Sequence, residues 1–293
     1  MIESSDYKTQ ALKKEDKNYP KNLARIKNSP KTLFYKGNPK VLHAKRSIAV
    51  VGSRRMTRYG KETVDRFISA FVSQNVVIIS GFMYGADSEA HRKTIEYSGK
   101  TIAVFGCGLD VCYPPENEKL YASILKTGGT LVSEYKDGMK PQLWTFPTRN
   151  RIVAGLSSLG VLVIEAGDRS GSLITAKLAK EMRRPVWAVP GPITSSVSIG
   201  CNWLIKSGEA KMATEPGDII GSVKNQGIKE QKINLSKTER MICEALQREP
   251  LNIDEIAARL GEGVIEVGKT ISLMSLKGLV AESAGKFYYS RAK

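Results

Sequence analysis

The segment 51–60, "VGSRRMTRYG", joins the end of a short apolar run to glycine, serine and three arginines. A helix-like stretch follows it, and nucleotide-binding folds place phosphate loops at such strand-to-helix junctions. The loop matches neither G-x-G-x-x-G nor G-x-x-x-x-G-K-[ST], the two common phosphate-loop motifs. A guanidinium is a planar fork of donors that suits phosphate oxygens. The loop therefore indicates a phosphate site of another kind, formed by Gly52, Ser53 and Arg54.

Two later segments offer related chemistry: "TFPTRNR" (145–151) ends a long connection expected over 136–151, and "DRSGSLIT" (168–175) is expected to open a helix. Amides and hydroxyls at a helix N-terminus bind anions, and glycine lets the backbone approach them closely. Three arginines beside such loops would hold several phosphates, more than one nucleotide needs. Two alternatives stay open: the small residues form only tight turns, or Arg151 and Asn150 brace the sheet edge. The candidate phosphate ligands from these segments are Arg149, Asn150, Arg151, Ser170, Gly171 and Ser172.

Aromatic residues lie just before these arginines. Trp144 and Phe146 are candidates for stacking on a base, as single-strand binders do, although a core role explains either equally well or nearly so. A basic polymer-binding surface also agrees with the composition, which has a formal net charge of +16. That charge favours a polyanionic partner, nucleic acid before anionic lipid.

The sequence offers little for catalysis. Asp87 and His91 are four residues apart and share one helix face, but with no nucleophile beside them they are expected to cap and tie loops. Glu134 and Glu165 end two strands and would either pair with each other or counter arginines. The acidic residue expected about 20 residues after a dinucleotide loop is not evident. We therefore expect no catalytic residues, no cofactor and no hydride transfer.

The four cysteines match no zinc spacing, so we expect no metal site. We expect the cysteines to be free thiols in a cytoplasmic protein. There is no apolar run of about 18 residues and no apolar signal segment near the start, so a membrane location is not expected.

Six short apolar runs recur from residue 47 onward and alternate with helix-like stretches. Because the runs are continuous rather than alternating, they predict strands buried on both faces. The alternation predicts an α/β fold, a doubly wound, Rossmann-like, mostly parallel sheet whose ligand site lies at the carboxyl ends of its strands. The runs are "SIAVVG" (47–52), "NVVIIS" (75–80), "TIAVFG" (101–106), "TLVSEY" (130–135), "LGVLVIEAG" (159–167) and "PVWAVPG" (185–191).

The domain organisation follows from composition and pattern. Pro and Gly interrupt residues 1–46, which are expected to form an irregular strap on the sheet domain of residues 47–222. Residues 223–235 are polar and aperiodic and predict a linker. Residues 236–293, with Ser236 as a helix N-cap and Glu239 three residues on, predict three helices and a hairpin in a winged-helix domain.

From about Tyr19 to Met212 the sequence resembles the DNA-processing protein A family (DprA, also called Smf). The resemblance depends on "IAVVGSRRMTRYG", "FPTRNRIVAGLS", "VIEAGDRSGSLITAKLA" and "VPGPI", of which the second and third are highly specific together. It implies a non-enzymatic protein that binds single-stranded DNA, forms a homodimer and helps load the RecA recombinase in natural transformation. It maps the family's phosphate pocket onto the residues named above. It also places Lys140 and Phe146 where the connecting loop would add a phosphate contact and a base contact.

This sequence departs from the family where "SGFMYGAD" (80–87) has Tyr84 and Ala86 instead of a basic residue and Ile. Dimerisation is expected near "CNWLIKSGEAKMATEPGDII" (201–220), where Trp203, Leu204 and Ile205 form an apolar group that core packing would equally explain.

Two other functions stay open. One is a nucleotide-processing enzyme of a related fold, such as a phosphoribohydrolase, although the "PGG-x-G-T" of those enzymes is replaced here by "DRSGSLIT". The other is a sequence-specific regulator acting through the winged helix. The near-neutral charge of residues 233–293 favours instead a protein-contact or autoregulatory role.

Overall fold

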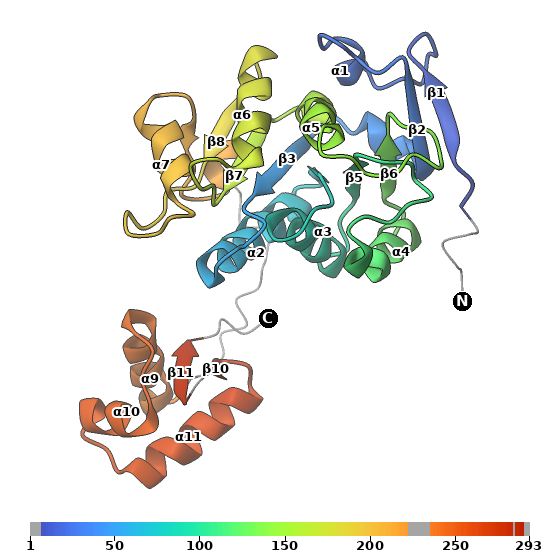
Figure 1. Ribbon diagram of the computed structural model, residues 1–293. Coiled ribbons are helices and arrows are strands. Elements are labelled where there is room, and N and C mark those ends of the chain that lie inside the picture. Colours follow the sequence, from blue (N-terminus) through green and yellow to red (C-terminus); the bar gives the residue numbers. More distant parts are fainter. Residues whose placement is uncertain (1–6, 222–234, 284, 290–293) are drawn as a thin grey trace. The chain divides into compact units, whose positions relative to one another are not determined.

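The six apolar runs form neighbouring parallel strands in the computed structural model (Figure 1). Their residues are almost all buried, as the continuous apolar pattern predicts. The structure describes residues 7–221, 235–283 and 285–289, and the chain divides into two units, 1–224 and 225–293. The strands are β3 (Ser47–Gly52), β4 (Val77–Ser80), β5 (Thr101–Phe105), β6 (Thr130–Ser133), β7 (Val161–Ile164) and β8 (Val186–Ala188).

The sheet has the order β1-β2-β6-β5-β4-β3-β7-β8-β9. From β3 the chain winds outward to β6, then returns to β7 on the other side of β3. Strand β3 pairs in parallel with both β4 and β7, so the strand order reverses between β3 and β7. The predicted doubly wound α/β fold is confirmed.

Helices cover both faces of the sheet (Figure 1). Phe67 and Phe71 pack with Ile78 on the face covered by α2 (Arg58–Ser73), α3 (Ala86–Glu96) and α4 (Glu118–Lys126). Val153 and Leu204 pack with Val163 on the other face. That face carries α1 (Lys21–Ala24), α5 (Thr145–Leu156), α6 (Gly171–Glu181) and α7 (Ile199–Lys206). Short elements complete the unit, namely η3 (Pro115–Asn117), β9 (Lys211–Met212) and α8 (Gly217–Ile220).

The segment before Ser47 differs from the prediction. Instead of an irregular strap, it contributes β1 (Gln10–Lys13) and β2 (Thr32–Gly37), followed by η2 (Pro39–His43). Strand β2 pairs antiparallel with β6, and it buries Leu33 and Tyr35 on one face by alternation. This period-two pattern is too short to distinguish from an irregular segment by sequence. A second difference is α5, which begins inside the connection expected after β6.

The second unit contains three helices and a hairpin, as predicted. They are α9 (Lys237–Arg248), α10 (Ile253–Leu260), α11 (Val264–Leu276), β10 (Val280–Ser283) and β11 (Lys286–Tyr289). Ser236 and Glu239 form the predicted capping box at the start of α9. The predicted linker lies outside the described residues except for Leu235. Within the described ranges, no helix is both long and apolar enough to cross a bilayer.

Candidate nucleic-acid interface

Four loops follow the carboxyl ends of β3, β4, β5 and β7, and we call them the rim loops: residues 53–57, 81–85, 106–114 and 165–170. The first and last meet where the strand order reverses, because Gly52 pairs with Ile164. A Cβ on Gly52 would lie 1.8 Å from the carbonyl oxygen of Ile164, so only glycine allows this approach. Open parallel sheets bind ligands outside such a reversal.

The loop after β3 is held by the loop after β4. The carbonyl of Ser53 accepts a hydrogen bond from the amide of Ala86 at 3.1 Å, and the Ser53 hydroxyl accepts one from the amide of Arg55 at 3.1 Å. Gly85, with φ of 71°, packs so closely that a Cβ there would lie 2.2 Å from the Ser53 carbonyl oxygen. Arg54 is exposed at this rim. Its backbone is therefore fixed while its guanidinium faces solvent.

Glu165 fixes the other end of the same loop. Its carboxylate is buried, and it accepts hydrogen bonds from the Thr57 amide at 2.8 Å and from the Thr57 hydroxyl. Thr57 in turn caps α2 through the amide of Gly60. Glu134 has a separate partner, the guanidinium of Arg151 at 2.5 Å. Glu134 therefore counters an arginine, whereas Glu165 positions the loop that carries Arg54.

Arg149 does not extend into solvent as a phosphate fork. Its side chain is only 3% exposed, and it donates hydrogen bonds to the carbonyls of Gly81 and Val104, at the ends of β4 and β5. Burial lowers the pKa of Arg149 to about 10, opposed by the nearby carboxylate of Asp87, so the guanidinium stays charged at neutral pH. The prediction that Arg149 contacts phosphate directly is therefore wrong. Arg149 instead makes buried hydrogen bonds that join two strand ends.

Arg151 also binds protein groups. Besides the ion pair with Glu134, it donates to the carbonyls of Asn28 at 2.9 Å and Thr148 at 3.1 Å. Positions 149 and 151 are two residues apart on α5, so their side chains leave the helix about 200° apart. The guanidiniums of Arg149 and Arg151 therefore point in different directions, whereas Arg54 lies close enough to Arg149 to lower its pKa. The alternative that Arg151 braces the sheet edge agrees with these contacts.

The start of α6 matches the predicted amide-rich turn. Ser170 is the N-cap, and its hydroxyl accepts a hydrogen bond from the amide of Ser172. Gly171 is exposed, and a Cβ there would meet nothing within 4 Å. Asn150 donates to the Gly171 carbonyl at 3.3 Å and so ties α5 to this turn. The residues Asn150, Ser170, Gly171 and Ser172 are thus gathered beside the end of β7.

Aromatic side chains accompany the rim loops. Phe146 is half-buried, and its ring centroid lies 5.5 Å from that of Tyr113 in the loop after β5. Trp144 is 55% exposed and meets Tyr135 edge-on at 5.9 Å. Lys140 is exposed beside Met139, whose carbonyl accepts from the amide of Gly108. Sequence reasoning missed Tyr113 and Tyr135, although each follows a strand end closely.

Asp87 and His91 are structural, as their sequence context predicted. His91 is fully buried, and its Nδ1 lies 2.6 Å from the Thr101 hydroxyl. Burial lowers the pKa of His91 to about 3, so the ring is neutral. Asp87 is buried and accepts from the amide of Met83, and burial raises the pKa of its carboxyl. Among the described residues, no group of three or more His, Cys, Asp or Glu is arranged to hold a metal ion.

Comparison with known proteins connects this geometry to a family. A family model described as DNA recombination-mediator protein A matches residues 10–224. The chain belongs to this family. A second model, the DprA winged helix domain, matches residues 229–286. The chain is thus a DNA-processing protein of the recombination-mediator class.

Relatives support this assignment along most of the chain. Protein Smf of Escherichia coli is 36% identical over 280 residues, which cover 92% of this chain and 74% of that protein. DNA processing protein DprA of Streptococcus pneumoniae is 44% identical over 202 residues, covering 69% of this chain and 70% of that one.

Solved structures of DprA proteins have the same fold. DprA from Streptococcus pneumoniae superposes with a TM-score of 0.69 at 42% identity, covering 74% of this chain and 75% of that one. DNA processing protein A from Helicobacter pylori, a structure described for its single-stranded DNA binding mode, gives a TM-score of 0.66 at 30% identity. Its match covers 74% of this chain and 95% of that one.

Two lysines of the second unit, within and just after α11, form ion pairs. Lys269 pairs with Glu266 at 2.9 Å, and Lys277 pairs with Glu239 at 2.6 Å. On the same helix, Leu276 is 85% exposed.

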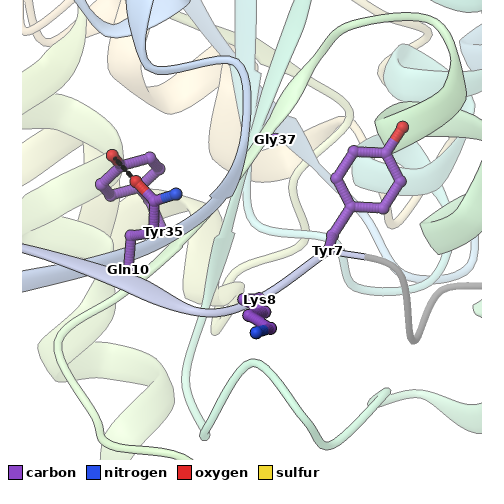
Figure 2. Close-up of a pocket in the computed structure, with 5 residues that line it drawn as sticks. All are labelled: Tyr7, Lys8, Gln10, Tyr35 and Gly37. Atoms are coloured by element: carbon purple, nitrogen blue, oxygen red, sulfur yellow. Dashed lines mark hydrogen bonds between the residues drawn. The ribbon is translucent and has the colours of Figure 1, made fainter.

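A cavity of about 310 Å³ is lined by Tyr7, Lys8, Gln10, Tyr35 and Gly37 (Figure 2). Gly37 pairs with Thr130, the first residue of β6, so this cavity lies toward the amino ends of the parallel strands.

Proposed function

We propose that this protein binds single-stranded DNA without sequence preference along the rim loops. The observation that carries the proposal is exposed Arg54 at the reversal of strand order, on a loop fixed by Glu165 and Gly85. Phosphate contacts position a strand without reading its sequence, and aromatic rings stack on any base. The single-stranded DNA binding of the Helicobacter pylori relative supports the assignment.

We propose further that the bound strand is passed to the RecA recombinase in the cytoplasm during natural transformation, and that the protein is a homodimer. The recombination-mediator family supports the first part. For the dimer, Trp203 on α7 is 53% exposed and Met212 on β9 is 54% exposed, whereas Leu204 is buried in the core. The exposed pair thus supports an interface near residues 201–220.

The protein acts, in this proposal, without catalysis. Two of the residues considered for catalysis have structural roles: His91 is buried and neutral, and Glu165 binds Thr57. An enzyme of the phosphoribohydrolase type would release free base from nucleoside monophosphates. Sustained base release during incubation with these compounds would contradict the binding role.

The direct test is fluorescence anisotropy with labelled oligo-dT over a series of salt concentrations. We expect tight binding at low salt, and a loss of about 1–3 kcal/mol of binding free energy for Arg54→Ala, the scale of a charge-assisted contact. The matched control is Lys126→Ala, an exposed cation at the opposite edge of the sheet, where no loss is expected. Equal affinities of wild type and Arg54→Ala would remove the loop from the site.

A further inference from the structure

We infer that Tyr84 is a base-stacking residue that receives the nucleobase next to the phosphate held by Arg54. This inference rests on the proposed function and names a ligand contact at the same site. Tyr84 lies in the loop after β4 and is 39% exposed. The backbone of this loop packs on that of Ser53 and Arg54 through Gly85, so ring and guanidinium project from adjoining backbone.

The ring of Tyr84 is held by a second loop. Its hydroxyl donates a hydrogen bond to Oε2 of Glu116 at 2.7 Å. This bond lowers the pKa of Glu116, so the carboxylate is ionised at neutral pH. An aromatic ring anchored at its polar end loses less freedom when a ligand stacks on it, which favours binding.

The charges around Tyr84 select a base rather than a phosphate as its occupant. The ionised carboxylate of Glu116 repels a phosphate, whereas Arg54, whose charge acts on the Tyr84 hydroxyl, attracts one. A neutral, flat nucleobase meets no such repulsion at the Tyr84 ring. One nucleotide therefore contacts both residues, with its phosphate at Arg54 and its base at Tyr84.

Further rings continue from this position. The Tyr113 hydroxyl lies near enough to that of Tyr84 for its ionised form to raise the pKa of Tyr84, and the ring of Tyr113 lies 5.5 Å from that of Phe146 at an interplanar angle of 33°. Tyr84, Tyr113 and Phe146 thus follow one another across the loops after β4 and β5 and the first turn of α5. Single-strand binders combine such stacking rings with cationic residues along the backbone path.

The test compares oligo-dT with an abasic deoxyribose-phosphate strand of equal length, using the full chain and anisotropy at fixed salt. For Tyr84→Ala we expect dT affinity to fall about 5- to 150-fold, the range for one stacked base, with little change on the abasic strand. Tyr84→Phe keeps the ring and is expected to retain most of the affinity. Equal losses on both strands, or no loss on dT, would overturn the inference.

The role of Glu116 as a positioning residue is tested by a double-mutant cycle. Loss of the Glu116 charge favours phosphate binding equally in both backgrounds, so Glu116→Ala should lower dT affinity in wild type relative to its effect in Tyr84→Phe, because phenylalanine has no hydroxyl to hold. A loss of equal size in both backgrounds would contradict positioning through Tyr84. Failure of the wild-type protein to bind dT even at low salt would instead overturn the proposed function, so the two failures are distinguishable.

Discussion

Arg149 and Asp87 flank Gly81 in the buried base of the rim loops. A Cβ on Gly81 would lie 2.6 Å from Oδ2 of Asp87 and 2.7 Å from Nη2 of Arg149. Arg149 also donates to the carbonyls of Gly81 and Val104, so one guanidinium joins two strand ends. The carboxylate of Asp87 offsets part of the cost of burying this guanidinium. The rim loops therefore rest on a buried charged group as well as on buried apolar side chains such as Phe82 and Leu109.

Removal of that group should destabilise the fold. Arg149→Met leaves two carbonyls without a donor and leaves the Asp87 carboxylate without its counter-charge. We expect the free energy of unfolding to fall by about 3–5 kcal/mol, the cost of breaking a buried ionic contact, as measured by urea denaturation. The matched control Arg54→Met, at an exposed site, should stay within about 0.5 kcal/mol of wild type. Equal stabilities of the two variants would contradict the buried role of Arg149.

Much of the sheet domain could be predicted from sequence, because continuous apolar runs such as "LGVLVIEAG" have one stable environment, a strand buried on both faces. The first phosphate loop was also predictable, since Gly52 and the following residues come directly after such a run. Strand β2 was not, because its alternation spans only a few residues. It becomes recognisable as a strand only through its pairing with β6.

The candidate site was predictable as a set of loops but not as a set of side-chain directions. The segment with Arg149 and Arg151 was expected to be a connection, so its helical phase was not considered. Because this segment forms helix α5, the two guanidiniums point toward different partners. Only the tertiary structure shows that Arg149 meets the end of β4 and that Arg151 meets Glu134. Tyr113 was missed because its neighbour Phe146 is distant in sequence.

Arg151 and Arg54 should differ in their effect on DNA binding. Arg54→Ala is expected to reduce the slope of log affinity against log salt by about 0.7, the value for one phosphate contact on a single strand. Arg151→Ala should leave this slope unchanged, since its three partners are Glu134, Asn28 and Thr148. It should instead lower the free energy of unfolding by about 1 kcal/mol, because partly exposed acceptors lose a charged donor. A reduced salt slope for Arg151→Ala would return Arg151 to the phosphate site.

His91 should make the fold sensitive to acid. Its pKa is lowered from 6.5 to about 3 in the folded chain, so the unfolded chain binds more protons between these values. Stability is therefore fully present above about pH 6.5 and falls as pH drops, by about 2 kcal/mol between pH 7 and pH 5. Urea denaturation at both pH values should show this loss in wild type and not in His91→Gln. The control His43→Gln, at the exposed histidine, should behave as wild type.

Variants of Glu165 should change the position of the loop that carries Arg54 without changing the charge of Arg54. Glu165 has a positive φ of 54°, and its carboxylate binds the amide and hydroxyl of Thr57. Glu165→Ala loses these charge-assisted bonds and keeps the strained backbone, so we expect a loss of about 1.5–3 kcal/mol in the free energy of unfolding. Glu165→Gly makes the same deletion with no Cβ, and should be more stable than Glu165→Ala by about 1 kcal/mol.

The DNA affinity of Glu165→Gly shows how much binding depends on the position of this loop. In Glu165→Gly the fold is largely retained and Arg54 is unchanged, but the amide of Thr57 no longer has its acceptor. We expect weaker binding of oligo-dT with an unaltered salt slope, because the number of phosphates neutralised stays the same while the loop must be ordered on binding. Thr57→Val removes both the hydroxyl donor to Glu165 and the cap of α2 at the Gly60 amide, and should give a loss in the same direction. Wild-type affinity in Glu165→Gly would show that the loop holds its conformation without the carboxylate.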